Sequence, residues 1–302
     1  MNYRLVHFIT VGTSIPRNFS SLLGKCHDFP EECPIKIEHR EIVEHLQILM
    51  KCLSIPPGSP SEIECINSLG GWGSLQDHIL DSLRWDHKRM SAELNAMNPW
   101  IEYAHSRDPD YVAGVYLYVT ETGSGILAGK VLKRYLEEKL PHASIKYRTI
   151  QGMRENLWQA LRSLAMAIGS DVRKTIARGE DEIVMLNLTG GLKPEGAIAL
   201  LEVARRPQAK AVAYYIHEIH RKPTPIPVIV SDSFILEARN LLRKRLQSPE
   251  RMIKVPVNEL DNYTKWLHYF AAAIEPLGLA RIGKDTILLD VDLARMIVQA
   301  EK

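Results

Sequence analysis

The stretch that decides the fold reads Asn187-Leu188-Thr189-Gly190-Gly191-Leu192-Lys193-Pro194. It follows an apolar run at residues 182–186, which is typical of a buried parallel strand, and it precedes residues 195–203, which are typical of a helix. A strand, a glycine turn, a lysine and a helix in this order expose backbone N–H groups at a helix N-terminus and add one cation. This arrangement suits a phosphate.

The beginning of the chain predicts the same layout. Residues 6–11 form an apolar strand, and the turn after it reads Gly12-Thr13-Ser14-Ile15-Pro16-Arg17-Asn18. Arg17 can donate two parallel hydrogen bonds to a phosphate, and Ser14 can donate to a phosphate oxygen or contact an attacking hydroxyl. Two such turns at carboxyl strand ends mark the place where an open α/β sheet binds ligands.

Both turns also have a plain structural interpretation. In the first, Thr13 or Ser14 only caps a helix; in the second, Thr189 caps the helix and Lys193 is solvated. We favour ligand binding because the two turns occur together, with Gly190 and Gly191 allowing a close approach of the backbone to a ligand.

A third turn, Thr120-Glu121-Thr122-Gly123-Ser124-Gly125, follows a predicted strand at residues 112–119. With Ala128 it matches the dinucleotide-binding pattern Gly-x-Gly-x-x-Ala, but the next strand ends without the acidic residue that this pattern requires. A nicotinamide-dependent oxidoreductase is therefore the weaker alternative. We expect Thr120, Thr122 and Gly123 to line the same crevice as the other two turns.

The bulk composition sets further limits. The chain has 302 residues, 45% of them hydrophobic, and a formal net charge of +2. This length suits one large α/β domain plus a smaller element, and this charge predicts no general affinity for nucleic acid or membranes. No apolar run reaches the roughly 20 residues of a membrane helix, and the N-terminus lacks a signal-peptide pattern, so we expect a soluble cytoplasmic protein.

The 4 cysteines, Cys26, Cys33, Cys52 and Cys65, form no Cys-x-x-Cys pair. Cys26 and Cys33 with His27 and His39 fit no standard metal spacing. We expect free thiols in a reducing cytosol, and neither a metal nor a cofactor.

The order of predicted elements favours a Rossmann-like, doubly wound, mainly parallel sheet with a helical insertion. The insertion covers about residues 38–105 and is broken at 56–58 and 70–73. Further helices are predicted at 126–140 and 157–178, and further strands at 143–150, 210–216 and 226–230, the last two antiparallel at the sheet edge. We place this domain at residues 1–231.

At residues 232–302 the alternation of predicted strands and helices gives way to a different pattern. A basic helix at 234–246, a helix at 263–275, a hairpin at 280–289 and a final helix from Asp292 are similar to a winged-helix element or a small dimerisation cap. Acidic residues interrupt the basic character of this segment, which argues against a strong role in DNA binding.

Two short motifs carry less weight. Arg40 and His45 have the Arg-x4-His spacing of one family of metal-independent ribonucleases, but they lie on a helix rich in glutamate that predicts a solvated face. His217-Glu218-Ile219-His220 is not a helical zinc motif and predicts a surface strand end. No Ser-His-Asp order indicates an acyl-transfer enzyme, and no pair of carboxylates indicates a glycosidase.

Taken together, the first strand with Gly12-Thr13-Ser14 and the later Asn187-x-Thr189-Gly190-Gly191-x-Lys193 resemble the CRISPR-associated Rossmann fold (CARF) domain over roughly residues 1–230. Met90-Ser91-Ala92-Glu93-Leu94-Asn95-Ala96-Met97 is similar to the archaeal subgroup of stand-alone CARF proteins. Some of these are ring nucleases, which degrade cyclic oligoadenylate second messengers.

The resemblance implies a homodimer whose two crevices merge and hold one cyclic tetra-adenylate. It implies Ser14 and Lys193 as the catalytic pair, with Thr13, Arg17 and Asn18 around the phosphates. The implied reaction is metal-independent attack of a ribose 2′-hydroxyl on its own 3′-phosphate, which gives linear di-adenylate with a 2′,3′-cyclic phosphate and switches off type III CRISPR antiviral signalling.

Two alternatives stay open. One is a CARF sensor or transcriptional regulator that binds the ring without cleaving it. The other is a different ring size, tetra- or hexa-adenylate. The residues also offer no clear general base, so the expected acceleration is modest.

Overall fold

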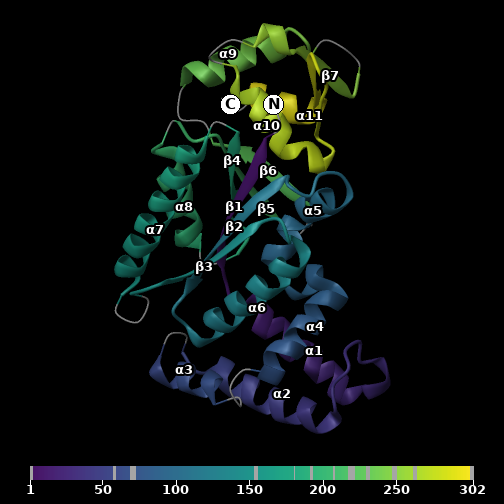
Figure 1. Cartoon of the computed structure of the whole chain (residues 1–302), viewed down its shortest axis with the longest axis vertical. Coiled ribbons are helices and arrows are strands. Elements are labelled where there is room, and N and C mark those ends of the chain that lie inside the picture. Colours follow the sequence, from purple (N-terminus) through teal and green to yellow (C-terminus); the bar gives the residue numbers. More distant parts are fainter. Residues whose placement is uncertain are drawn as a thin grey trace.

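The computed structural model of the chain describes residues 3–56, 59–68, 73–152, 156–179, 181–190, 193–206, 208–216, 222–228, 232–246, 250–260 and 264–299 (Figure 1). Its main sheet has six strands in the order β3-β2-β1-β4-β5-β6. Their bounds are Arg4–Val11 (β1), Val112–Thr120 (β2), Ser144–Ile150 (β3), Glu182–Asn187 (β4), Ala211–Ile216 (β5) and Pro223–Pro227 (β6). The first five pair in parallel and β6 pairs antiparallel at the edge, which confirms the predicted α/β fold.

Helices cover both faces of this sheet, so its central strands are buried on both sides. Every residue of β4 is buried, and in β1 only Arg4 is exposed. Side chains alternate along β1: Val6 and Phe8 join α7 (Leu157–Arg178) and α8 (Lys193–Ala204) in one apolar cluster. Leu5 and Ile9 join the cluster on the other face, with α1 (Ser14–Asp28), α5 (Ala92–Ser106) and α6 (Gly123–Lys139).

The helical insertion predicted at about residues 38–105 is confirmed, with two further interruptions. It consists of α2 (His39–Ser54), α3 (Pro60–Asn67), α4 (Gly73–Met90) and α5, and it follows α1 and the short η1 (Pro30–Glu32). One interruption is a kink inside α4 at Asp86, whose φ of −151° and ψ of 78° are not helical. The other lies at Ser91, whose extended backbone and side-chain oxygen cap α5 by accepting a hydrogen bond from the Leu94 N–H.

Three helices begin earlier than expected. The turn predicted over residues 12–18 is shorter, because α1 already begins at Ser14. Gly123 and Lys193 are likewise the first residues of α6 and α8 rather than parts of preceding loops. α7 ends at Gly179 as predicted, where a positive φ of 138° favours glycine.

The expectation of free thiols is wrong. Cys26 is joined to Cys33, and Cys52 is joined to Cys65, so none of the four is a free thiol or a candidate metal ligand. The first disulfide ties the end of α1 to the segment after η1, and the second ties α2 to α3. No Cys-x-x-Cys pattern marks these pairs, because each disulfide joins cysteines that lie in separate segments of the chain.

The C-terminal element packs on the opposite end of the domain from α2 and α3 (Figure 1). It contains α9 (Asp232–Arg243), β7 (Met252–Pro256), η3 (Val257–Glu259), α10 (Trp266–Ile274), η4 (Glu275–Leu277), β8 (Ala280–Ile282), β9 (Thr286–Asp290) and α11 (Val291–Gln299). The predicted hairpin is present as β8 and β9, and the strand β7, which we did not predict, extends it to a three-stranded sheet in the order β7-β9-β8.

Several features of the sequence lie outside the described residues: the 217–220 motif, Gly191, Leu192 and the side chain of Lys193. Within the described ranges, no helix combines the length and the apolar character that crossing a membrane requires.

Candidate functional site at the ends of strands β1 and β4

The two turns singled out in the sequence lie next to each other at the carboxyl edge of the sheet. β1 and β4 are hydrogen-bonded neighbours, with Ile9 opposite Asn187. From this edge the chain enters α1 on one face of the sheet and α8 on the other face. Two helix N-termini that diverge from adjacent parallel strands define the position where doubly wound sheets bind ligands.

The turn after β1 is the more open of the two. Gly12, Thr13 and Ser14 are partly exposed, and Arg17 is exposed. Asn18 has a structural contact, because its side-chain amide donates to the carbonyl oxygens of Arg89 and Met90 at the end of α4, at 3.0 and 3.2 Å. Thr13, Ser14 and Arg17 are therefore the side chains of this turn that a ligand can reach.

The turn after β4 uses its polar side chains to hold its own shape. Asn187 is buried, and its Oδ1 accepts a hydrogen bond from the Thr189 N–H at 3.0 Å. Thr189 Oγ1 accepts one from the Ile216 N–H at 3.1 Å, and Thr10 donates to the Gly190 carbonyl at 2.9 Å. These hydrogen bonds hold Asn187, Thr189 and Gly190 in place, and α8 begins with Lys193 at the same edge of the sheet.

A residue that sequence reasoning did not single out for chemistry, Glu93, joins the two turns. Its carboxylate Oε1 accepts a hydrogen bond from the Gly12 N–H at 2.9 Å, and its Oε2 accepts one from the Ser14 hydroxyl at 3.0 Å. Oε2 also accepts from the Ser91 hydroxyl at 2.8 Å. The backbone carbonyl of Glu93 accepts from the Asn187 side chain at 3.0 Å, so both turns are fastened to the first turn of α5.

The fit between Glu93 and the second turn explains why glycine stands at position 190. A Cβ atom there would lie 2.4 Å from Glu93 Oε1 and 2.6 Å from the Thr10 carbonyl oxygen. Gly190 has no positive φ, so lack of space alone excludes a side chain. Glu93 belongs to the sequence stretch 90–97 noted above, but no local pattern indicates that its carboxylate reaches a turn 80 residues earlier.

The third turn is placed differently. Thr122 and Gly123 are buried, Thr120 is partly buried, and the Thr122 hydroxyl caps α6 by accepting from the Gly125 N–H. The Glu62 carboxylate of α3 accepts hydrogen bonds from the Gly123 and Ser124 N–H groups at 3.1 and 3.0 Å. An anion of the protein itself therefore occupies the N-terminus of α6, where we expected an open lining of the crevice.

Behind the site, β1 contributes a buried histidine. His7 Nδ1 lies 2.9 Å from the Tyr214 hydroxyl, and the ring contacts Trp100 edge-on. Complete burial lowers the pKa of His7 to about 3 and raises the pKa of Tyr214. His7 is therefore neutral near pH 7 and is a core residue rather than a proton donor at the crevice.

The remaining candidates from the sequence are not brought to this edge. Arg40 is exposed and pairs with Glu44, whereas His45 is buried beside His78, so Arg40 and His45 face different surroundings. Within the described ranges, no group of three or more histidine, cysteine, aspartate or glutamate side chains is arranged to hold a metal ion.

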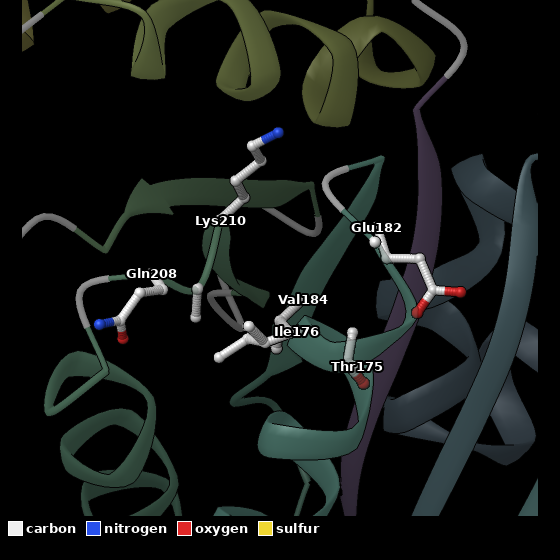
Figure 2. A pocket seen from close by; sticks show the side chains of 8 residues that line it. Thr175, Ile176, Glu182, Val184, Gln208 and Lys210 are labelled. Carbon is white, nitrogen blue, oxygen red and sulfur yellow. The ribbon is translucent and has the colours of Figure 1, made fainter. Parts of the chain in front are cut away.

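A pocket of about 460 Å³ lies at the opposite edge of the sheet. It is formed by the end of α7, the start of β4 and the residues before β5: Thr175, Ile176, Gly179, Glu182, Val184, Gln208, Ala209 and Lys210. Figure 2 shows the charged ends of Lys210 and Glu182 pointing in different directions. Lys210 lies over the Tyr3 ring, and the Glu182 carboxylate lies 3.6 Å from Arg4 and from Arg178. The charged groups that line the pocket therefore do not converge on a ligand.

Part of the chain is similar to a known protein family. Residues 88–229 match the model of a family described as CRISPR-associated protein (Cas_APE2256). The matched segment contains Glu93, the third turn and the turn after β4, and it ends just after β6. The chain is thus similar to a CRISPR-associated family over this segment.

Proposed function

We propose that the protein is a ring nuclease that binds cyclic tetra-adenylate and cleaves it to linear di-adenylate with a 2′,3′-cyclic phosphate, which ends type III CRISPR signalling. One observation carries the proposal: the Ser14 turn and the α8 N-terminus with Lys193 meet at the switch point between β1 and β4. The similarity to a CRISPR-associated family supports the proposal that the ligand at this edge is a cyclic oligoadenylate.

The reaction is an internal transesterification, and it needs no external nucleophile. The ribose 2′-oxygen attacks its neighbouring 3′-phosphorus, the bond from phosphorus to the next 5′-oxygen breaks, and one proton moves from the 2′-oxygen to the 5′-oxygen. The protein must hold the attacking and leaving oxygens in line and stabilise the charge that builds on the phosphorane. In this proposal Lys193 and the α8 N-terminus supply that charge stabilisation, and Arg17 holds a neighbouring phosphate.

The charge of the ring makes a homodimer part of the proposal. A ring of four phosphates carries four negative charges, whereas the two turns of one chain supply one arginine, Arg17, and one lysine, Lys193. Two copies related by a two-fold axis would present each cation twice and would match the symmetry of the ring.

The packing of α9 and α10 argues against DNA binding by a winged-helix element. α10, the helix that precedes the β8–β9 hairpin, is almost wholly buried. Trp100 Nε1 donates to the Ala273 carbonyl at 2.7 Å, and the Tyr111 hydroxyl donates to Ala272, so α10 is fixed against the main domain. Arg239 on α9 is buried and donates to the Ile297 carbonyl, so it is not available to a DNA phosphate.

The proposal is tested with full-length protein and cyclic tetra-adenylate, with binding and product formation measured separately. Lys193→Ala should lower the cleavage rate by about 10²–10³, as removal of one electrostatic contact to the transition state does. Ser14→Ala should lower the rate with less loss of binding. Lys133→Ala, which removes a partly exposed lysine paired with Glu137 on α6, is the matched control and should cleave normally.

Two results would decide against the proposal. Cleavage by Lys193→Ala at the wild-type rate would show that the site is wrong. Tight binding by the wild type without any cleavage over hours would make the protein a sensor.

A further inference from the structure

We infer that Glu93 is a positioning residue for this cleavage: its carboxylate takes the proton of Ser14, so that the Ser14 oxygen accepts a hydrogen bond from the attacking ribose 2′-hydroxyl. The inference rests on the proposed function and supplies the proton acceptor that the sequence did not reveal. It assigns to Ser14 one of the two roles that the sequence left open, contact with the attacking hydroxyl rather than donation to a phosphate oxygen.

The direction of the Ser14 hydrogen bond carries the argument. A serine hydroxyl has one proton and two lone pairs, and a carboxylate can only accept. Because Ser14 Oγ lies 3.0 Å from Glu93 Oε2, its proton points to the carboxylate and its lone pairs are left for other donors. Ser14 is partly exposed and Glu93 is 1% exposed, so a substrate hydroxyl can reach Ser14 while Glu93 acts only through it.

The surroundings of Glu93 hold its carboxylate in this position. The Gly12 N–H and the Ser91 hydroxyl each donate to it, and the Asn187 amide fixes its backbone carbonyl. A carboxylate held by several donors from different elements loses little further freedom when the substrate binds.

The α6 N-terminus provides an internal comparison. There the Ser124 hydroxyl donates to Glu62 Oε1 at 2.7 Å, which repeats the same serine–glutamate pair. Ser124, however, is 2% exposed, and a substrate cannot reach its oxygen. Glu62 therefore serves to cap α6, whereas Ser14 of the Glu93–Ser14 pair is partly exposed at the carboxyl edge of the sheet.

The proton can be followed through the step. As the 2′-oxygen bonds to phosphorus, its proton passes to Ser14 Oγ, and the Ser14 proton passes to the Glu93 carboxylate. The bond from phosphorus to the 5′-oxygen breaks, the 5′-oxygen takes a proton from water, and Glu93 returns its proton to solvent. General base assistance of this kind contributes about 10²–10⁴ in rate.

The test is a double-mutant cycle on kcat and KM with full-length protein and cyclic tetra-adenylate. Glu93→Gln should lower kcat by about 10² or more while KM changes by less than about threefold. In the Ser14→Ala background, Glu93→Gln should change kcat by less than about twofold, because Glu93 acts through Ser14. Glu182→Gln is the matched control, since it removes a buried carboxylate at the opposite edge of the same sheet and should keep the wild-type kcat.

Two other outcomes of this cycle would overturn the inference. Equal losses of kcat from Glu93→Gln with and without Ser14 would indicate a purely structural role. Tighter binding at an unchanged kcat would indicate an anion that merely competes with the ligand.

Glu93→Asp keeps the charge but ends one methylene short of Ser14. It provides a second test if the glutamine variant does not fold: kcat should fall at least tenfold, and a wild-type kcat would contradict the assignment. If the wild type leaves the ring intact, the proposed function fails. If the wild type cleaves and Glu93→Gln cleaves equally well, only the inference fails.

Discussion

Replacement of Gly190 by alanine tests whether the contact between the second turn and Glu93 holds the site together. The new Cβ would lie 2.4 Å from Glu93 Oε1, 2.6 Å from Glu93 Cγ and 2.6 Å from the Thr10 carbonyl oxygen. The carbonyl belongs to the central strand β1 and cannot retreat, and Glu93 is held by its own donors. We expect the free energy of unfolding to fall by about 1–3 kcal/mol, the usual cost of overpacking.

The matched control is Gly196→Ala, in the helix α8 that follows the same turn. Its nearest neighbour would be Leu188 Cδ2 at 3.7 Å, an ordinary contact, so the alanine should stabilise α8 by up to about 1 kcal/mol. Urea denaturation of both variants measures the difference, and the cleavage assay should show a lower rate for Gly190→Ala alone. A Gly190→Ala protein as stable and as active as the wild type would refute the packing argument.

Three further predictions concern the rest of the molecule. Since the pKa of His7 is about 3 in the folded state and about 6.5 when unfolded, the unfolded state takes up this proton first as the pH falls. The free energy of unfolding should therefore decrease by about 2 kcal/mol between pH 7 and pH 5. Urea denaturation at several pH values should show a weaker pH dependence for His7→Gln over this range. An equally strong pH dependence in this variant would contradict the burial of a neutral ring. Joint replacement of Cys52 and Cys65 by serine should cost about 3 kcal/mol, measured in the same way, because their disulfide closes a loop with a sequence separation of 13; an unchanged midpoint in non-reducing buffer would contradict the pairing. Light scattering should give the mass of a dimer when the ring is bound, and a monomer that binds the ring with full affinity would exclude a shared crevice.

Much of the fold was predictable because it follows from local patterns. The apolar run before Asn187 fixes β4 as a strand buried on both faces, and the three- and four-residue spacing of apolar side chains fixes α7 up to Gly179. The alternation of strands and helices then predicts a parallel sheet, and with it the meeting of the Ser14 and Lys193 turns at one edge.

The features that could not be predicted depend on contacts between distant segments. The pairing of Cys52 with Cys65 and the reach of Glu62 to Gly123 require the exact packing of the helical insertion, which no periodicity encodes. The same holds for Glu93, which lies far from Ser14 in sequence. Each of these residues looks like an ordinary helical side chain until the helices are placed around the sheet.

The most direct test of the central claim is to incubate the purified full-length protein with cyclic tetra-adenylate in excess EDTA and to resolve the products. The account predicts linear di-adenylate that ends in a 2′,3′-cyclic phosphate, formed at the same rate as without chelator. An intact ring in both conditions, or cleavage that is lost in EDTA and restored by Mg²⁺ or Mn²⁺, would contradict it.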